Sequence, residues 1–464
     1  MVLNNTHIIQ SLPSCNEDCF KESIRAELIA QNRIIVVLDD DPTGTQTMHN
    51  IPVLTNWDKS VIEDELKREP RLFYILTNSR SMIASEADSI HRLIGRNIGL
   101  VFKKFKRDYI VISRGDSTLR GHYPNDIIAL GEGLQLNSFH TAVIPAFFEG
   151  GRITIKDVHY VRDGEHLIPV AETPFAKDRV FGFLHSNLKE WITEKTDGVV
   201  KASAVVSFSL DELRNQSVVA IADKIKKLSP STTCIVNAVA YCDVEKFAIA
   251  YLQSGVQMLF RTAASFVKAI SGIEEKNFLT AKELVKEGNQ NGGLIIIGSY
   301  VPKTTSQLQA LLLDETITAF ELNVNDILER ELKVDDVVNE MEHLIGAGNH
   351  VVMYTSRLLK TGNSESENLK IGNQVSGFIT AVVAALKIVP RFMIAKGGIT
   401  SSDIATKALG MNRAMVAGQA LSGVPVWMAG EESKFPGLPF IIFPGNVGSD
   451  NALVELYKKI INIH

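Results

Sequence analysis

The fold class is decided by a short stretch near the start of the chain, Ile34–Thr45 (IIVVLDDDPTGT). Five branched apolar residues in a row predict a strand that is buried on both faces, as in a parallel sheet. Pro42 and Gly44 then end that strand. Ligands of open α/β sheets bind outside the carboxyl ends of the strands, so we expect the three aspartates at a binding site.

The three aspartates, Asp39, Asp40 and Asp41, stand next to one another in the sequence. Carboxylates this close repel unless a metal ion, a cation or a proton compensates them. Such a cluster is typical of a general base or a magnesium anchor, and a solvated acidic turn is the alternative.

The composition limits the class of protein. The chain has 464 residues, of which 45% are hydrophobic and 22% charged, as in a soluble protein of two domains. A net charge of -5 argues against a nucleic-acid or anionic-membrane surface as the main function. We find no signal-peptide pattern and no apolar stretch long enough to cross a bilayer, and expect a cytoplasmic protein. The cysteines show neither zinc-ligand spacing nor a disulfide framework, so we expect free thiols at Cys15, Cys19, Cys234 and Cys242.

Strand, polar tip and helix alternate through the first half of the chain. Apolar runs at 72–76, 109–112 and 141–144 predict strands, and 85–105 predicts a helix. This order is typical of βαβ units around a mostly parallel sheet. Its tips carry Arg80, Arg114, Asp116 and Arg152 beside the three aspartates, and guanidinium groups match carboxylates and phosphates.

Two segments of the first half depart from this alternation. Caps and apolar spacing predict a leading helix over Ser14–Gln31. The segment 151–201 is rich in glycine, proline and charge, and we expect a long, partly ordered excursion that folds over the site.

The second half begins after a polar run, 286–293, which predicts a domain boundary. Its strands end in glycine and hydroxyl residues instead of charges. Gly397–Asp403 and Gly445–Asp450 lead directly into predicted helices, whose first N–H groups can bind an anion. Neither loop fits the P-loop or the dinucleotide fingerprint, and ordinary tight turns are the alternative. Together with Ser299 and Ser356 they favour a nucleotide.

We therefore predict two α/β domains, each a mostly parallel sheet flanked by helices, with the active site in the interdomain cleft. The predicted ranges are 1–30 for a helical extension, 31–285 for a domain that binds a sugar acid, and 292–464 for a domain that binds a nucleotide.

Several long segments in a fixed order carry a resemblance to a known family. They are the DDDPTG turn, SRGDSTLRG at 113–121, PAFFEGGR at 145–152, FRTAAS at 260–265, GGIT at 397–400 and GNVG at 445–448. With them, nearly the whole chain beyond residue 30 resembles the four-carbon acid sugar kinases. This resemblance implies phosphorylation of the terminal hydroxyl of threonate, erythronate or a 3-oxo-tetronate, with ATP and Mg²⁺ as cofactors.

The resemblance also implies the residues of the site. Substrate contacts carried over by motif are Asp40, Asp41, Arg80, Arg114, Gly115, Asp116 and Ser117. Contacts to ATP carried over in the same way are Ser265, Ser356, Gly397, Gly398, Ile399, Thr400 and Gly445. The chain departs from the family pattern in Thr45-Gln46-Thr47, which follow the acidic turn, in Ile399, which stands where an acid is common, and in Phe443-Pro444-Gly445.

The mechanism that we expect uses Arg80 and Arg114 to hold the substrate carboxylate. Asp41 is the expected base and Asp116 the competing one, and no residue is assigned to a metal. A non-catalytic sugar-acid binder and an NAD-dependent oxidoreductase of a hydroxy acid are the alternatives. The sequence leaves open the preferred acid and its stereochemistry, the role of residues 1–30 and the oligomeric state, a homo-oligomer included.

Overall fold

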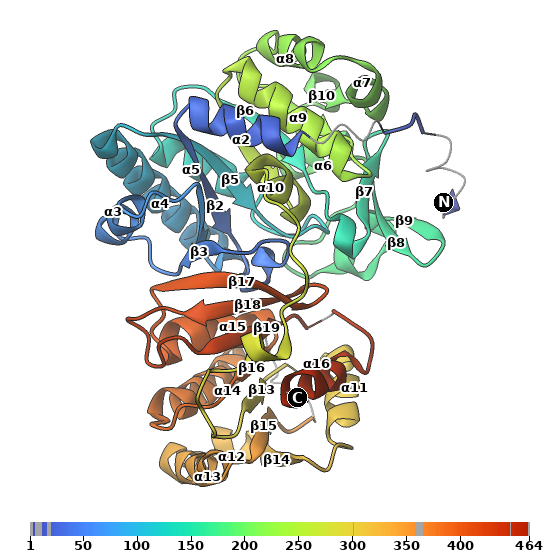
Figure 1. The fold of residues 1–464 in the computed structure, drawn as a ribbon. Helices are drawn as coiled ribbons and strands as arrows, with labels where there is room; N and C mark the ends of the chain where they lie inside the picture. Colours follow the sequence, from blue (N-terminus) through green and yellow to red (C-terminus); the bar gives the residue numbers. More distant parts are fainter. Residues whose placement is uncertain are drawn as a thin grey trace. The chain divides into compact units, whose positions relative to one another are not determined.

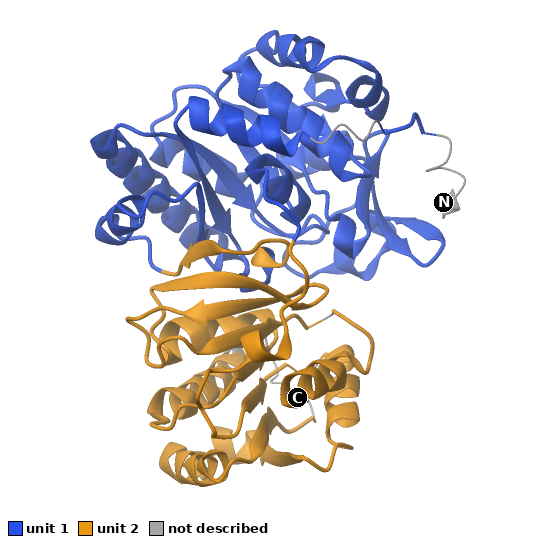
Figure 2. Cartoon of the chain, viewed as in Figure 1, with its two compact units in different colours: residues 1–44, 56–275 blue, residues 45–55, 276–464 orange. Residues whose placement is uncertain are grey.

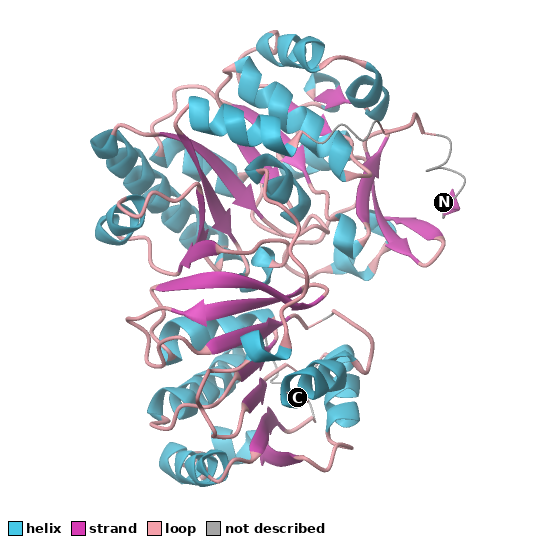
Figure 3. Ribbon diagram, in the orientation of Figure 1, coloured by secondary structure: helices cyan, strands magenta, loops and turns pink. Residues whose placement is uncertain are grey.

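A computed structural model describes residues 3–4, 12–15, 20–299, 301–357, 365–445 and 447–462. The chain forms two compact units, residues 1–44 with 56–275 and residues 45–55 with 276–464 (Figure 2). Each unit has a sheet with helices packed against it (Figure 3), which confirms the predicted α/β class. The short segment 45–55, which directly follows the acidic turn, belongs to the second unit by its contacts. The domain ranges given above stay a prediction.

The sheet of the first unit is parallel, in the order β10-β11-β6-β12-β5-β2-β4. Figure 1 labels β2, β5, β6 and β10 of this sheet. β4 and β5, the next two strands of this sheet along the chain, lie on opposite sides of β2. A crevice outside the carboxyl end is expected where the strand order reverses in this way, and for β2 that end is the acidic turn. The strands are β2 (Arg33–Asp39), β4 (Leu72–Leu76), β5 (Asp108–Arg114), β6 (His140–Ile144), β10 (Val206–Phe208), β11 (Thr233–Val236) and β12 (Met258–Thr262).

The helices of this unit bury one apolar face each, as α4 shows. Ile94, Ile98, Val101 and Phe102 recur at helical spacing and are buried, so this helix forms as the sequence predicts. Of the leading helix predicted over Ser14–Gln31, α2 forms from Lys21 to Ala30, and residues 16–19 lie outside the described residues. The helices are α2 (Lys21–Ala30), α3 (Lys59–Leu66), α4 (Ala84–Phe105), α5 (Asn125–Gly133), α6 (Leu188–Lys195), α7 (Leu210–Asn215), α8 (Val218–Lys226), α9 (Tyr241–Ser254) and α10 (Ala264–Ser271).

The segment after residue 151 is ordered, which corrects the expectation of a partly ordered excursion. Its strands β7, β8 and β9 form a small antiparallel sheet together with β1 from the start of the chain, in the order β1-β9-β8-β7. The turn between β7 and β8 is made by Lys156 and Asp157, both at positive φ, as a two-residue hairpin requires. The strands are β1 (Leu3–Asn4), β7 (Arg152–Ile155), β8 (Val158–Asp163) and β9 (His166–Pro169), and short helical turns lie at Pro42–Thr45, Ser79–Ser81, Phe148–Gly150, Val170–Glu172, Pro174–Lys177 and Ala202–Ala204.

The sheet of the second unit has the order β3-β17-β18-β19-β16-β13-β15-β14. The last five strands in this order are parallel, whereas β3, β17 and β18 run antiparallel to their neighbours. β15 and β16 flank β13, so the strand order reverses at β13. The strands are β3 (Ile51–Leu54), β13 (Leu294–Ile297), β14 (Ile317–Leu322), β15 (His350–Thr355), β16 (Met393–Lys396), β17 (Arg413–Leu421), β18 (Val424–Ala429) and β19 (Pro439–Phe443). The helices are α11 (Pro302–Leu311), α12 (Val324–Leu328), α13 (Val334–Gly346), α14 (Glu365–Ala385), α15 (Gly398–Asp403) and α16 (Ala452–Ile461), with short turns at Ala281–Leu284 and Ile404–Ala408.

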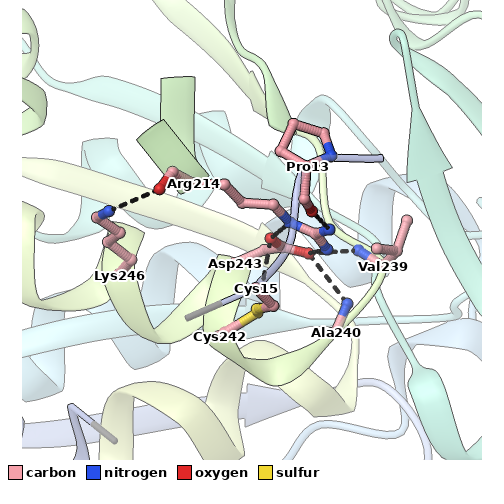
Figure 4. The surroundings of a disulfide bond; sticks show 8 residues. All are labelled: Pro13, Cys15, Arg214, Val239, Ala240, Cys242, Asp243 and Lys246. Atoms are coloured by element: carbon pink, nitrogen blue, oxygen red, sulfur yellow. Dashed lines mark hydrogen bonds and ion pairs between the residues drawn. A yellow bond between two sulfur atoms is a disulfide. The ribbon is translucent and has the colours of Figure 1, made fainter. Parts of the chain in front are cut away.

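A disulfide joins Cys15 to Cys242 at the start of α9 (Figure 4), so the expectation of free thiols is wrong for these two residues. Arg214 and Asp243 surround it: the guanidinium donates to the carboxylate at 2.7 and 3.0 Å and to the Pro13 carbonyl at 2.6 Å. Pro13 and Cys15 are thus held against α7 and α9 by partners far along the chain, which local patterns do not reveal. Cys234 is a buried free thiol and Cys19 lies outside the described residues. Among the described helices, none combines the length and the apolar character needed to cross a membrane.

Candidate functional site

Asp39 is the first and most deeply buried aspartate of the acidic turn. It ends β2 with 1% of its surface exposed, and its Oδ1 accepts from Arg114 Nη1 at 3.1 Å and from the Asp41 N–H at 3.2 Å. A Cβ on Gly44 would lie 1.9 Å from Asp39 Oδ2, so only glycine lets the turn close over the carboxylate. Burial raises the pKa of Asp39 to about 7 against the opposing charge of Arg114. Asp39 is therefore a structural acid rather than an accessible one.

Asp40 and Asp41 share a single arginine. Arg80 donates to Asp40 at 2.5 Å (Nη2 to Oδ1) and 3.1 Å (Nε to Oδ2), and its Nη1 lies 3.2 Å from Asp41 Oδ2. Burial alone would raise the pKa of Asp40, but the charges of Arg80, Arg261 and Arg114 together hold it below its ordinary value. The acidic turn is thus compensated by arginines of this chain.

Asp116 lies in the loop after β5 and has its own arginine. Its Oδ2 accepts from Arg120 Nε at 2.8 Å and from the Thr118 hydroxyl. Burial opposes ionisation, yet Arg80 and Arg120 hold the pKa of Asp116 well below its usual range. Since Arg80 acts on both loops, the acidic turn and the loop after β5 form one electrostatic network.

Arg261, near the end of β12, packs against the loop that follows β5. A Cβ on Gly115 would lie 1.5 Å from Arg261 Nη1, and one on Gly121 would lie 2.7 Å from Nη2. The guanidinium also donates to the Arg120 carbonyl at 3.2 Å, and its Nε lies 3.5 Å from Asp126 Oδ2. The two glycines therefore leave space for the guanidinium. Both glycines and Arg261 lie in the SRGDSTLRG and FRTAAS segments, but the sequence does not show that these two segments contact each other.

Two histidines hold the backbone near these loops. His159 on β8 is fully buried, with its Nε2 2.8 Å from the Ser117 carbonyl and its Nδ1 3.0 Å from Thr154 Oγ1. Burial lowers the pKa of His159 to about 4, so the ring is neutral near pH 7. His122 Nε2 lies 2.9 Å from the Ser79 carbonyl. Both residues position loops of the site.

Arg152, at the start of β7, differs from the other arginines of this region. Its guanidinium lies 6.0 Å from the ring centroids of both Phe147 and Phe175, and its Nη1 donates to the Gly150 carbonyl. Within the described residues it forms no ion pair with a carboxylate, and its Nε makes no hydrogen bond. Arg152 is only half-buried, so a guanidinium without a carboxylate partner lies in the region of Asp116, whose charge acts on it.

The structure brings the predicted substrate residues of the first unit into one network. Arg80 and Arg114 nevertheless face the aspartates of the turn, whereas the sequence analysis expected both to face the substrate. Gly115 and Ser117 take part through their backbones: the Gly115 N–H donates to the Thr262 carbonyl at 2.9 Å, and the Ser117 carbonyl oxygen lies 2.8 Å from His159 Nε2.

Ser265 lies in the first unit, near the start of α10, away from the other predicted nucleotide contacts in the sequence. It is fully buried, and its hydroxyl accepts from the Phe148 N–H at 2.9 Å and donates to Glu149 Oε2 at 3.3 Å. These bonds join α10 to the loop after β6. A role of Ser265 with the nucleotide stays a prediction.

The glycine loops of the second unit meet at the carboxyl ends of β13, β16 and β19. Gly397 has a φ of 108°, which favours glycine, and a Cβ on Gly298 would lie 2.8 Å from Thr400 Oγ1. Gly398 and Thr400 open α15, while Ile399 between them is 59% exposed. The backbone is therefore tightly packed here with an apolar side chain at its surface.

The other predicted contacts flank this loop pair. The Gly445 carbonyl accepts from Thr304 Oγ1 at 3.3 Å, and Ser356 Oγ accepts from the Val324 N–H at 3.2 Å. Arg357, next to Ser356, donates to the Ser299 carbonyl at 2.7 Å. Tyr300 and Asn446, which belong to the predicted turns, lie outside the described residues.

Lys396 is the residue of this edge that the sequence analysis missed. It ends β16 directly before the paired glycines and has no exposed surface. Its Nζ donates to the Pro444 carbonyl at 3.1 Å and lies 4.2 Å from the centroid of the Phe443 ring. Burial lowers the pKa of Lys396 to about 7, with a further contribution from Lys303. A lysine at a strand end before two glycines was the available signal.

Comparisons with known proteins also divide the chain into an N-terminal and a C-terminal domain. Residues 35–270 match the family of sugar-binding N-terminal domains, and residues 294–453 match that of nucleotide-binding C-terminal domains. A comparison with curated proteins gives no match.

Solved structures with low sequence identity share the fold. A Haemophilus influenzae protein of the DUF1537 family is 16% identical with a TM-score of 0.62, covering 92% of this chain and 100% of its own. A Salmonella typhimurium LT2 protein that bears the provisional name of a tRNA synthase is 16% identical with a TM-score of 0.65, covering 91% of this chain and 98% of its own. The two matched domains make up one family, and the chain belongs to it: the four-carbon acid sugar kinase family.

Proposed function

We propose that the protein is an ATP-dependent kinase that phosphorylates the terminal hydroxyl of a four-carbon sugar acid of the threonate, erythronate or 3-oxo-tetronate type. The observation that carries the proposal is the pairing of a sugar-binding with a nucleotide-binding domain in one chain. Phosphoryl transfer mainly requires positioned reactants, Mg²⁺ and a carboxylate near the attacking hydroxyl. The acidic turn supplies the carboxylates for this role.

Asp41 is the better base of the two candidates. A base must accept a proton, and the charges of Arg80 and Arg120 that keep the pKa of Asp116 low make it a weak proton acceptor. Asp41 has one carboxylate oxygen 3.2 Å from Arg80 and the other 2.8 Å from the Thr43 N–H, and its side chain is 18% exposed. We therefore assign proton transfer to Asp41 and hydroxyl orientation to Asp116.

For the substrate carboxylate we propose Arg152 in addition to the arginines named from the sequence. Arg80 and Arg114 already pair with the aspartates, so a second carboxylate would compete with those ion pairs. Arg152 pairs with no carboxylate among the described residues and stands beside two aromatic rings. A guanidinium in this state can take a carboxylate bidentately without breaking an existing pair.

The nucleotide would be held by the loops that begin at Gly397 and Gly445, with Ser265 and Ser356 as further proposed contacts. The first N–H groups of a helix such as α15 have no partner within the helix and can bind phosphate, and the exposed Ile399 offers apolar surface. Mg²⁺ supplies charge compensation for the phosphates when bound. Since the carboxylates of the acidic turn are paired with arginines, we assign none of them to the metal. The interdomain position of the active site stays a prediction.

The test is ADP release from Mg-ATP in the presence of D- and L-threonate, D- and L-erythronate, the 3-oxo-tetronates and longer aldonic acids. A strong signal with one four-carbon acid supports the kinase and names its substrate. Thermal stabilisation by sugar acid without turnover would instead indicate a binding protein, and stabilisation by NAD an oxidoreductase. If no acid of the panel is turned over and the protein does not bind ATP, the proposal is overturned.

A further inference from the structure

Lys396 is a cation that the second unit buries, and no anion among the residues that the structure describes pairs with it. Its side chain has no exposed surface, and within the described residues it forms no ion pair. The Pro444 carbonyl occupies one of its three N–H donors, and the Phe443 ring faces the ammonium. A carbonyl and an aromatic ring compensate a buried ammonium only in part, so the position costs stability.

The charged neighbours of Lys396 among the described residues do not compensate its charge. Lys303, in the first turn of α11, is the charged group that acts on it, and Asp450 lies 3.0 Å from the Lys303 ammonium. The strand ends next to it, from β13 and β19, carry uncharged residues at Gly298, Ser299 and Gly445. The carboxyl end of β16 thus has an excess of positive charge beneath loops that suit phosphates.

We infer that Lys396 supplies the positive charge that draws the phosphates of a nucleotide to the loops at Gly397 and Gly445. This inference rests on the proposed function and adds a residue to it. Because a buried charge is weakly screened, Lys396 acts on the phosphates from beneath the loops. Burial of the ammonium lowers the stability of the free protein, and binding of a polyanion offsets this loss. This accounts for a lysine at a position where a methionine of similar length would fit.

The experiment measures nucleotide binding to the full chain by isothermal titration calorimetry, with Lys396→Met and the matched control Lys407→Met. Lys407 is an exposed lysine of the same unit that pairs with Asp403. We expect the Kd for Mg-ATP to rise about tenfold or more in Lys396→Met, as for other charge-assisted contacts. The loss should shrink from ATP to ADP to adenosine, and Lys407→Met should bind like the wild type.

Stability without nucleotide separates this role from a structural one. If Lys396 serves the phosphates, Lys396→Met keeps or raises the Tm of the free protein, since a neutral side chain of similar length replaces a buried ammonium. If it only holds Phe443 and Pro444 in place, the Tm falls and the losses for ATP and adenosine are equal, which overturns the inference.

Proton uptake gives an independent readout. With a pKa of about 7, Lys396 is half-protonated at pH 7, so phosphate binding should take up as much as about half a proton more in the wild type than in Lys396→Met. Titrations in two buffers of different ionisation enthalpy measure this difference. Equal proton uptake in the wild type and in Lys396→Met, together with an unchanged Kd, would contradict the inference. ATP binding by the wild type would still leave the kinase proposal intact. If the wild type binds no ATP, both fail.

Discussion

The two sheet edges balance charge in opposite ways. At the edge of the first unit, each aspartate of the turn and of the loop after β5 pairs with an arginine of this chain, as Asp40 does with Arg80. At the edge of the second unit, Lys396 is buried with no ion pair among the described residues. The first edge is preorganised by its own charges, whereas we infer that a ligand of opposite charge completes the second. This difference suits a small polar substrate on one unit and a polyanion on the other.

The largest effect is expected from Asp41→Asn, which removes the proposed base and keeps the shape of the turn. We expect kcat to fall by about 10²–10⁴-fold, the usual contribution of general acid–base catalysis. The Kd for ATP should not change, because the substituted residue belongs to the other edge. Steady-state kinetics and calorimetry measure the two quantities.

Asp116→Asn is the matched comparison, and its kcat should fall less than that of Asp41→Asn. Turnover of Asp41→Asn at the wild-type rate would remove Asp41 from the mechanism, and a larger loss in Asp116→Asn would exchange the two roles.

Arg114→Met tests the internal compensation of the first edge. Asp39 would lose its buried partner, which typically costs about 3–5 kcal/mol in the free energy of unfolding. The cost should be greater at pH 8, where Asp39 is ionised, than at pH 5, where it is protonated. Arg92→Met, which breaks an exposed pair with Glu132, should change stability by less than about 0.5 kcal/mol. Urea unfolding at both pH values decides, and equal small changes in both variants would show that the buried pair contributes nothing.

Arg152→Gln sharpens the comparison within the first edge, because it removes an arginine that pairs with no carboxylate among the residues that the structure describes. We expect the KM for the sugar acid to rise about tenfold or more, as for a lost charge-assisted contact, with little change in stability or in the Kd for ATP. Arg120→Gln, which breaks the pair with Asp116, should instead lower kcat and stability together. An unchanged KM in Arg152→Gln would return the carboxylate to Arg80 and Arg114.

The last prediction concerns the pH dependence of stability. The folded protein holds a proton on Asp39 up to a pKa of about 7, above the ordinary value of 3.8, so folding binds a proton in this range. The contribution of Asp39 to the free energy of unfolding is complete when the pH is below its ordinary pKa. It falls as the pH rises from there towards 7, by at most about 1.4 kcal/mol per pH unit. Asp39→Asn should remove this part of the slope in unfolding measured from pH 4 to 8. Parallel profiles of the two proteins would show that Asp39 ionises normally.

Local patterns predicted much of the fold. The apolar run before Asp39 and the helical spacing of α4 depend on neighbours within a few residues, and both elements form as expected. The same holds for the glycine-rich ends of the second-unit strands. The antiparallel strands β7 to β9 were missed because charged and glycine residues hid their short apolar runs.

By itself, the sequence determined the fold class, the family and which residue types gather at each sheet edge, because alternation, strand ends and motifs are local properties. Only the tertiary structure decided how those residues pair. It turned Arg80 and Arg114 towards the aspartates, gave Arg152 no carboxylate partner within the described part of the chain, buried Lys396 and joined Cys15 to Cys242. The physical reason is that each of these states depends on burial and on partners far along the chain, and neither quantity is encoded in any short stretch of residues.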